Sequence, residues 1–319
     1  MDRSSKHGRR NGVSRDSSGS DSPTYAHVND ELVPMADATV SIRDRGFMYG
    51  DGVFETLRAY GGEIFRWDAH ADRLADSATA IKLDHGLSRT TLKNRIDETL
   101  AANGLDEAYV KLSITRGAQP GKLNPDPVTD PTVVVQTSPL SRGGVNSDPV
   151  WDGPATLQTV KTRRISDRAL PSHAKTHNYL NGILARAELR VSDADEAVML
   201  DTDGQLAEGA TGNIFFIDGN GLCTPALDGS VLPGITRSTV LEIAAEEEIP
   251  VNEGTFDIDD LREAEEAFVT NTTWEIRPVD TVDGIDIGSG PLTSLLQQSF
   301  QKRVEEQYYS TADEMANKN

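Results

Sequence analysis

Short strand-like segments occur in two groups along this chain, and helical patterns follow the strands in each group. In the first group, residues 51–67 alternate polar and apolar side chains around a Gly61-Gly62 turn. Two amphipathic helical patterns then cover residues 69–83 and 89–105, and strands over 108–117 and 131–139 flank a loop. Antiparallel strands combined with a pair of helices predict an α+β fold.

The second group begins with a strand over residues 155–164 and continues as hairpins over 196–225. A helix follows the Pro-Gly pair at 233–234, and an amphipathic helix over 291–308 closes the pattern. We therefore predict an α+β chain of two domains, with these boundaries: a disordered extension over 1–22, an N-terminal α+β domain over 23–143, a linker over 144–153, a C-terminal domain over 154–309 and a frayed acidic tail over 310–319.

Acidic side chains strongly outnumber basic ones, with 51 Asp and Glu against 31 Lys and Arg, a net charge of −20. This excess argues against nucleic acid or an anionic membrane as a partner. Because the acidic residues are scattered rather than gathered in one tail, the pattern is typical of a protein kept soluble in high salt, and we predict a halophilic source.

Cys223 is the single cysteine, so we expect no internal disulfide and a reducing cytoplasm. No apolar run reaches the length of a membrane span.

Lys175 stands in a context suited to covalent chemistry. After it, apolar residues recur at spacings of three and four (Tyr179, Leu180, Ile183, Leu184, Ala187), which predicts a packed helix beginning just beyond the lysine. Partial desolvation beside such a stripe favours the neutral amine, which is the form that attacks aldehydes.

Covalent lysine catalysis with pyridoxal phosphate (PLP) also needs an anion site and a partner for the pyridine nitrogen. The segment 233–238 predicts the anion site, because the amides of Ile235 and Thr236 lie at a helix N-terminus and Gly234 allows close approach. Arg73 can complete the phosphate clamp with two hydrogen bonds. Glu208, at a strand end before a Gly-rich turn, can keep the pyridine nitrogen protonated.

Six segments in order resemble the class IV (fold-type IV) PLP enzymes, a family that includes branched-chain and D-amino-acid aminotransferases and aminodeoxychorismate lyase. The resemblance covers about residues 25–309, and its motifs are RGFMYGDGVFETLR, HADRLADSA, KTHNYLNGILA, AEGATGNIFF, PGITR and FVTNTTWEIRPV. It implies the two-domain fold-type IV architecture, PLP as cofactor, no metal, a small amino substrate and a homodimer in which one subunit covers the site of the other.

The resemblance also implies roles for individual residues. Lys175 would form the Schiff base with PLP and shuttle the proton. Glu208 would pair with the pyridine nitrogen, and Tyr179 matches the tyrosine that branched-chain enzymes place on the phenolic oxygen. The phosphate would be held by four residues, with Asn271 beside them: Arg73, Ile235, Thr236 and Thr272.

The reaction is less well specified than the family. D-amino-acid aminotransferases carry an Arg-x-His carboxylate trap where this chain has Gly121 and Leu123, and a tyrosine where it has Phe54, so that activity is disfavoured. This chain has the sequence FET at residues 54–56 and TNT at residues 270–272. Branched-chain enzymes usually have FEG and GTA at these two places, whereas aminodeoxychorismate lyases often have FET and TN. Thr56 and Asn271 add polar groups that favour a polar, ring-bearing substrate over leucine or valine.

The sequence therefore favours a lyase that converts 4-amino-4-deoxychorismate into 4-aminobenzoate and pyruvate, for folate synthesis. Its substrate carboxylates need cations, and the candidates by segment are Arg58, Arg116 and Lys122. The alternative is transamination, in particular of a branched-chain amino acid with 2-oxoglutarate. Tyr179 and the amino-acid sequence of residues 66–78 resemble those of archaeal branched-chain enzymes. A non-catalytic PLP-binding homologue is the remote third interpretation.

Overall fold

A computed structural model describes residues 24–140, 151–219, 221–227 and 230–309. The predicted N-terminal extension, most of the predicted linker and the predicted acidic tail lie outside the described residues, so the domain boundaries stay predictions. Within the described ranges, no helix combines the length and the apolar character that crossing a membrane requires. The same ranges contain no group of three or more His, Cys, Asp or Glu side chains able to hold a metal ion.

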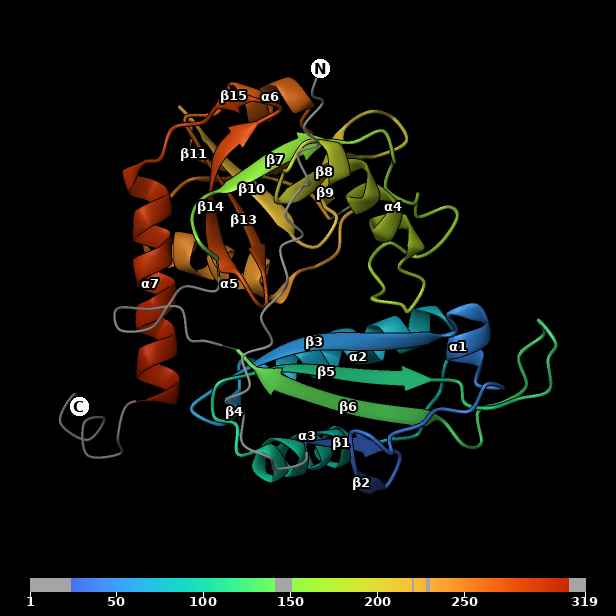
Figure 1. Ribbon diagram of the computed structural model, residues 1–319. Coiled ribbons are helices and arrows are strands. Elements are labelled where there is room, and N and C mark those ends of the chain that lie inside the picture. The colour runs from blue at the N-terminus through green and yellow to red at the C-terminus, as the bar shows by residue number, and fades with distance from the viewer. Residues whose placement is uncertain (1–23, 141–150, 220, 228–229, 310–319) are drawn as a thin grey trace, which may run out of the picture.

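The first half of the chain forms a six-stranded antiparallel sheet (Figure 1), as the alternating pattern predicted. The strand order is β2-β1-β6-β5-β3-β4. The strands are β1 (Tyr25–Val28), β2 (Glu31–Pro34), β3 (Gly52–Tyr60), β4 (Glu63–Ile64), β5 (Ala108–Thr115) and β6 (Thr132–Pro139).

Two long helices pack their apolar side chains against this sheet, α2 (Trp67–Ala80) and α3 (Arg89–Asn103). Both helices were predicted. The hydroxyl of Ser88 caps α3 by accepting from the amide of Thr91 at 3.0 Å, and Gly104 ends the helix at φ 60°. The short helix α1 (Arg45–Tyr49) was missed, because its five residues are too few for a helical period.

The second half forms a nine-stranded mixed sheet with the order β12-β11-β10-β13-β14-β7-β8-β9, and β15 pairs with β14. The pairs β7–β8, β7–β14 and β11–β12 are parallel, and the other pairs are antiparallel. The strands are β7 (Ala155–Thr159), β8 (Glu196–Leu200), β9 (Leu206–Gly209), β10 (Asn213–Asp218), β11 (Gly221–Pro225), β12 (Val251–Gly254), β13 (Glu266–Asn271), β14 (Glu275–Val282) and β15 (Ile285–Asp286).

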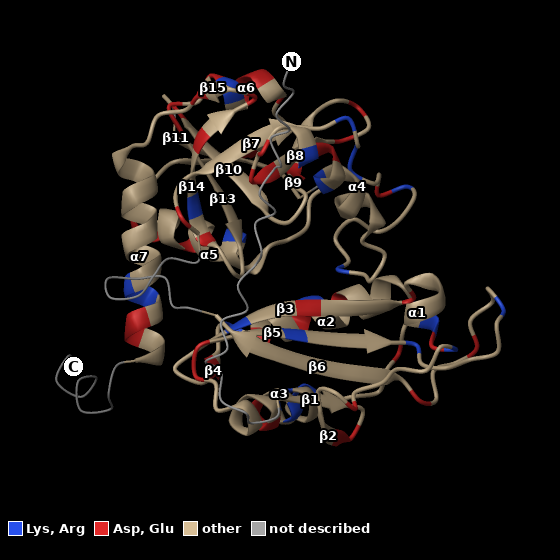
Figure 2. Cartoon of the chain, in the orientation of Figure 1, with Lys and Arg blue, Asp and Glu red and all other residues tan. Residues whose placement is uncertain are grey.

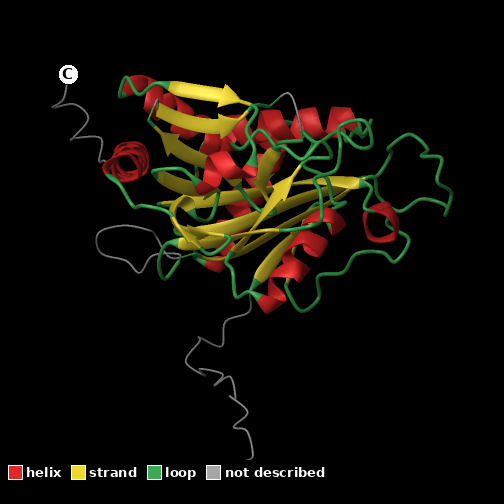
Figure 3. Ribbon diagram, turned by 90° about the horizontal axis from the view of Figure 1, so that it is seen from above, coloured by secondary structure: helices red, strands yellow, loops and turns green. Residues whose placement is uncertain are grey.

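Helices α5 (Ile235–Glu246) and α7 (Pro291–Tyr308) pack on one side of this sheet, and their buried residues surround the stacked rings of Phe215 and Phe268. The remaining helices are α4 (Leu180–Glu188), the 3₁₀ turn η1 (Leu189–Val191) and α6 (Ile258–Arg262). Cys223 is buried in β11, where burial raises the pKa of its thiol to about 11. Figure 3 shows the strands of both sheets through the middle of the molecule, with α7 seen end-on.

The prediction that the apolar stripe of α4 is semi-buried is wrong for this chain. Leu180, Ile183 and Leu184 are 60%, 61% and 51% exposed, and the buried positions of the helix are Gly182 and Ala185. The period of the pattern was correct, but it indicates only that one face is apolar, and this face points outward here.

One of the contacts between the two halves lies along the first residues of β3. The segment before α4 reaches down to this strand (Figure 1), where Thr176 forms an isolated bridge with Val53. Acidic residues, red in Figure 2, are spread along the cartoon of both halves rather than gathered in one segment, as the scattered acidic pattern predicted.

We predict that Leu112→Ala in β5 destabilises the fold by about 2–5 kcal/mol, because it leaves a cavity in a fully buried site. Urea unfolding measures the change. Leu32→Ala is the control, since Leu32 is 39% exposed on an edge strand, and it should change the free energy of unfolding by no more than about 0.5 kcal/mol. Equal losses in the two variants would contradict the assignment of the core.

Candidate active site

A cavity of about 380 Å³ lies where the two halves meet, and both halves contribute to its wall. It brings together ten residues that the sequence singled out: Phe54, Thr56, Arg73, Lys175, Tyr179, Glu208, Ile235, Thr236, Asn271 and Thr272. A smaller cavity of about 60 Å³ adjoins it and shares three of them, Lys175, Tyr179 and Glu208.

Lys175 lies on an irregular segment, and its backbone is fixed by the first half of the chain. Its amide donates to the hydroxyl of Ser77 at 2.9 Å, and its carbonyl accepts from the amide of Phe54 at 3.0 Å. Its Nζ lies 4.6 Å from the ring centre of Phe54 and 5.4 Å from that of Tyr179. The amine is therefore held against two aromatic rings at the cavity wall, an environment less polar than water.

The N-terminus of α5 forms the anion-binding end of the cavity. Its N-cap residue, Gly234, provides no side-chain hydrogen bond to the first turn, so the amides of Ile235 and Thr236 are left to a ligand. A Cβ on Gly234 would lie 2.0 Å from Oδ1 of Asn213, which explains why glycine is required at this close approach.

Arg73 reaches this end of the cavity from α2 and is held by a buried carboxylate. Its Nε and Nη2 donate to the two oxygens of Glu55 at 2.8 and 2.6 Å, and its Nη1 donates to the carbonyl of Pro233 at 2.9 Å. His70 Nδ1 lies 2.8 Å from the same carboxylate. Burial acts to raise the pKa of Glu55, but Arg73 and then His70 outweigh it and hold the pKa at about 2. Glu55 therefore stays charged and fixes the guanidinium.

The end of β13 and the turn after it form another part of the cavity wall. One polar side chain there is hydrogen-bonded within the turn, and another has no hydrogen-bond partner. Oδ1 of Asn271 accepts from the amides of Thr273 and Trp274 at 3.0 and 2.7 Å, so it shapes the turn. The hydroxyl of Thr270 is buried in the cavity wall and has no hydrogen-bond partner in the structure. An unsatisfied hydroxyl beside free helix amides and an arginine fits a phosphorylated ligand.

Glu208 is buried at the end of β9 and hydrogen-bonded on both oxygens. Oε1 pairs with Nη2 of Arg164 at 2.6 Å, and Oε2 accepts from the amide of Leu232 at 3.0 Å and from Nδ2 of Asn213 at 3.1 Å. Burial raises its pKa, although Arg164 opposes the shift. These contacts fix the carboxylate in the walls of both cavities, where it can face a cationic ring nitrogen.

Arg58, Arg116 and Lys122, the cations predicted for substrate carboxylates, do not line either cavity. Arg58 is buried, donates to the carbonyl of Thr273 at 2.9 Å and pairs with Glu275. It therefore holds the turn after β13 from behind, a role that its position in a strand pattern does not reveal.

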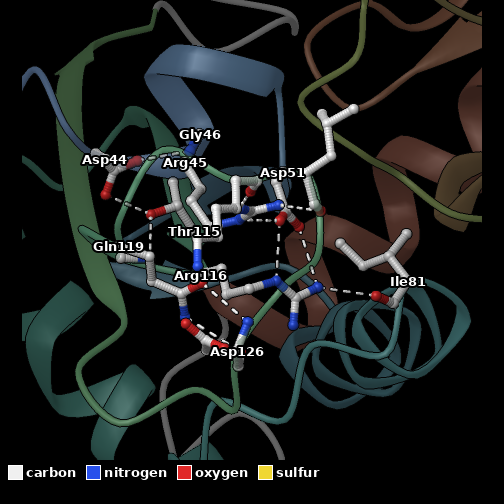
Figure 4. Close-up of polar contacts among 12 residues, drawn as sticks. Asp44, Arg45, Gly46, Asp51, Ile81, Thr115, Arg116, Gln119 and Asp126 are labelled. Carbon is white, nitrogen blue, oxygen red and sulfur yellow. Dashed lines mark hydrogen bonds and ion pairs between the residues drawn. The ribbon is translucent and has the colours of Figure 1, made fainter.

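Arg116 is committed to structural contacts (Figure 4). It pairs with Asp51 and donates to the carbonyls of Ile81 and Lys82 just beyond the end of α2. Asp51 also binds Arg45, whose Nη1 donates to the carbonyl of Lys122 at 2.6 Å. The carboxylate of Asp51 thus joins Arg45, which holds the loop over residues 117–131, to Arg116, which holds the end of α2, so Arg116 is not left for substrate.

Two residues of β5 that were not among the predicted site residues lie on the side of the sheet that faces the cavity. Tyr109 lines the cavity, whereas Lys111 is not one of its lining residues and stands opposite the lining residue Thr56 in the β3–β5 register. The Nζ of Lys111 lies 5.0 Å from the ring centre of Phe54. Strand alternation placed Tyr109 and Lys111 on one face, but only the pairing with β3 places that face at the cavity.

Comparison with known proteins identifies the family to which the chain is similar. Residues 52–282 match the model of the family described as "Amino-transferase class IV". A putative branched-chain-amino-acid aminotransferase of Methanocaldococcus jannaschii is 38% identical over 279 residues, 86% of this chain and 94% of that protein. A D-alanine aminotransferase of Listeria innocua is 35% identical over 280 residues, 87% of this chain and 95% of that one.

Solved structures are similar in fold. The branched-chain aminotransferase of Thermoproteus uzoniensis with norvaline superposes with a TM-score of 0.83 at 31% identity, covering 90% of this chain and 97% of that one. The 4-amino-4-deoxychorismate lyase of Pseudomonas aeruginosa does so with a TM-score of 0.76 at 27% identity, covering 87% and 98%. Another branched-chain aminotransferase, at 29% identity and TM-score 0.82, was solved with pyridoxamine 5'-phosphate, and the match covers 89% of this chain and 94% of that one. With these relatives and a cavity whose donors suit a phosphorylated cofactor, the chain belongs to the class IV aminotransferases and is a PLP-dependent enzyme.

Proposed function

We propose that this enzyme is a transaminase that moves the amino group of an aliphatic amino acid to 2-oxoglutarate. The placement of Lys175 is the observation that carries the proposal, with its amine against two aromatic rings and an anion-binding helix end in the same cavity. The relatives that are similar over nearly their whole length, named for branched-chain amino acids and D-alanine, support amino transfer as the reaction.

In this proposal Lys175 both holds the cofactor and moves the proton. When bound, PLP supplies a ring that withdraws electrons from the α-carbon of an amino acid. Between turnovers the Nζ of Lys175 would hold the cofactor covalently. With substrate bound, the free Nζ of Lys175 would accept the α-hydrogen as a proton and later give the proton up again, so that it serves as base and then as acid.

The other residues of the cavity would each hold one charged or polar group of the cofactor. Arg73, the amides of Ile235 and Thr236, and Thr272 hold the phosphate. Glu208 keeps the ring nitrogen protonated, and Tyr179 donates to the phenolic oxygen. Asn271 lies beside the phosphate ligands, with its oxygen committed to the turn.

The substrate end of the cavity favours an aliphatic side chain. Phe54, Tyr179, Tyr109 and Trp274 contribute rings to the wall. The lyase remains the second candidate, because Thr56 adds a hydroxyl to that wall and a lyase structure shares the fold. The other sequence arguments for the lyase are weaker in the structure, since Asn271 serves the turn and the predicted cations Arg58 and Arg116 have structural partners.

A separate group supports an acidic amino acceptor. Lys111 is half-buried on β5, and among the described residues no carboxylate pairs with it. A half-buried cation beside Phe54 and opposite Thr56 is suited to the distal carboxylate of 2-oxoglutarate. The same cation would be unused by a keto acid that carries one carboxylate.

Paired substrate assays test the reaction. We expect L-leucine or L-valine with 2-oxoglutarate to give glutamate rapidly, and 4-amino-4-deoxychorismate to release no 4-aminobenzoate. D-alanine run in parallel tests the stereochemistry. Release of 4-aminobenzoate without any keto acid, together with slow glutamate formation, would establish the lyase instead.

Lys111→Met tests the acceptor. We expect the KM for 2-oxoglutarate to rise about 10- to 100-fold, the size expected for loss of a charge-assisted hydrogen bond, and the KM for 4-methyl-2-oxopentanoate to change less than about twofold. Lys122→Met, in the loop away from the cavity, is the matched control. If both KM values rose together in Lys111→Met, the lysine would not recognise the distal carboxylate.

We also propose a homodimer, because an isolated chain leaves two apolar faces uncovered. Phe47 on α1 is 74% exposed, and Ile183 on α4 is 61% exposed. Sedimentation should give a species of about twice the 34.6 kDa chain mass. Ile183→Glu should shift it towards the monomer, whereas Leu295→Glu, at an exposed site on α7, should not. A monomeric wild-type protein would refute the dimer.

The halophilic source and cytoplasmic location stay predictions.

A further inference from the structure

The segment that carries Lys175 has little regular structure of its own. Between residues 171 and 179 it consists of turns and one isolated bridge, and α4 begins only at Leu180. The position of Lys175 therefore depends on contacts with other parts of the chain, which makes those contacts candidates for a role in catalysis.

Helix α2 provides one of these contacts from a polar face that points into the molecule. His70, Arg73 and Ser77 are spaced by three and four residues, so they lie on one side of the helix. All are buried, and Ser77 is 1% exposed. His70 and Arg73 bind Glu55, whereas the Oγ of Ser77 accepts the amide hydrogen of Lys175 at 2.9 Å. One helix face thus serves both the anion-binding arginine and the lysine.

The opposite side of the same residue is held by β3. The carbonyl of Lys175 accepts from the amide of Phe54 at 3.0 Å, and two residues later His177 donates to the carbonyl of Gly52 at 2.9 Å. The backbone of Lys175 is therefore bonded on its N–H side by Ser77 and on its C=O side by Phe54. Of these contacts, only the one with Ser77 is made by a side chain, so a single substitution can remove it.

We propose that Ser77 is a positioning residue for Lys175, acting through the lysine backbone without touching substrate or cofactor. The proposal rests on the proposed function, in which Lys175 moves the proton. Loss of the hydroxyl leaves an amide hydrogen without its acceptor and lets the segment drift from β3. Because proton transfer requires close alignment, a displacement of about 1 Å slows it about 100-fold.

The test compares Ser77→Ala with a conservative and a distant variant, all as holoenzymes. In Ser77→Ala we expect kcat to fall about 10- to 100-fold, with KM within about twofold. With an α-deuterated amino acid the primary isotope effect should rise, because proton removal becomes more rate-limiting. Ser77→Thr keeps the acceptor and should restore most of kcat. Thr99→Ala, which removes a buried helix hydroxyl bonded to the Arg95 carbonyl, should change neither quantity.

Hydrogen exchange gives a readout independent of activity. The peptide covering residues 172–179 should exchange about tenfold faster in Ser77→Ala than in the wild type, and peptides of α3 should not change. If Ser77→Ala fails to fold, Ser77→Cys, which keeps the volume and weakens the acceptor, should show the same changes in smaller measure.

Borohydride reduction separates the two proposals. If it fixes the cofactor to Lys175 while Ser77→Ala and Ser77→Cys behave as the wild type, the role of Ser77 is refuted and the proposed function stands. If borohydride fixes the cofactor to another residue or to none, the proposed function fails first. A loss of kcat without a higher isotope effect or faster exchange would also overturn the positioning role.

Discussion

The contact between residues 175–177 and the first residues of β3 is the interaction on which the rest of the site depends. Through it, an irregular segment of the second half acquires a fixed position against a sheet of the first half. This contact brings the lysine of the second half to the cavity wall beside the arginine of the first half, and further contacts between the halves, such as Arg73 with the carbonyl of Pro233, join them elsewhere. A hydrogen bond to a backbone amide contributes modest free energy, but here such bonds fix the backbone from which the side chain of Lys175 extends.

Buried charges in the site are each matched by an opposite charge. Arg73 is charged and buried, a combination that is unfavourable without a partner, and Glu55 offsets the cost with two hydrogen bonds. Glu208 is paired in the same way with Arg164. Each of these two charges in the cavity wall is therefore fixed by a second charge behind it.

Local patterns predicted the elements well, and the reasons for the failures are physical. Helices α2, α3, α5 and α7 follow apolar periods that tertiary packing did not override, and the N-terminus of α5 was recognisable from Pro233 and Gly234. The exposed stripe of α4 was misjudged, because a period shows that a face is apolar but not what covers it. Arg58 and Arg116 were predicted to bind substrate, but they pair with Glu275 and Asp51 in the structure. The prediction failed because no local sequence pattern shows that these carboxylates lie within reach of the two arginines.

The sequence by itself determined the family and predicted the residues that would hold PLP, since six ordered motifs each carry a local reason for their residue types. Only the tertiary structure decided which of those residues share a cavity and which serve as supports. Glu55 with Arg73, Ser77 with Lys175 and Lys111 opposite Thr56 are all contacts between elements that are distant in sequence or set by strand register. Such contacts follow from the way the sheets and helices pack, and helical or strand periods contain no information about them.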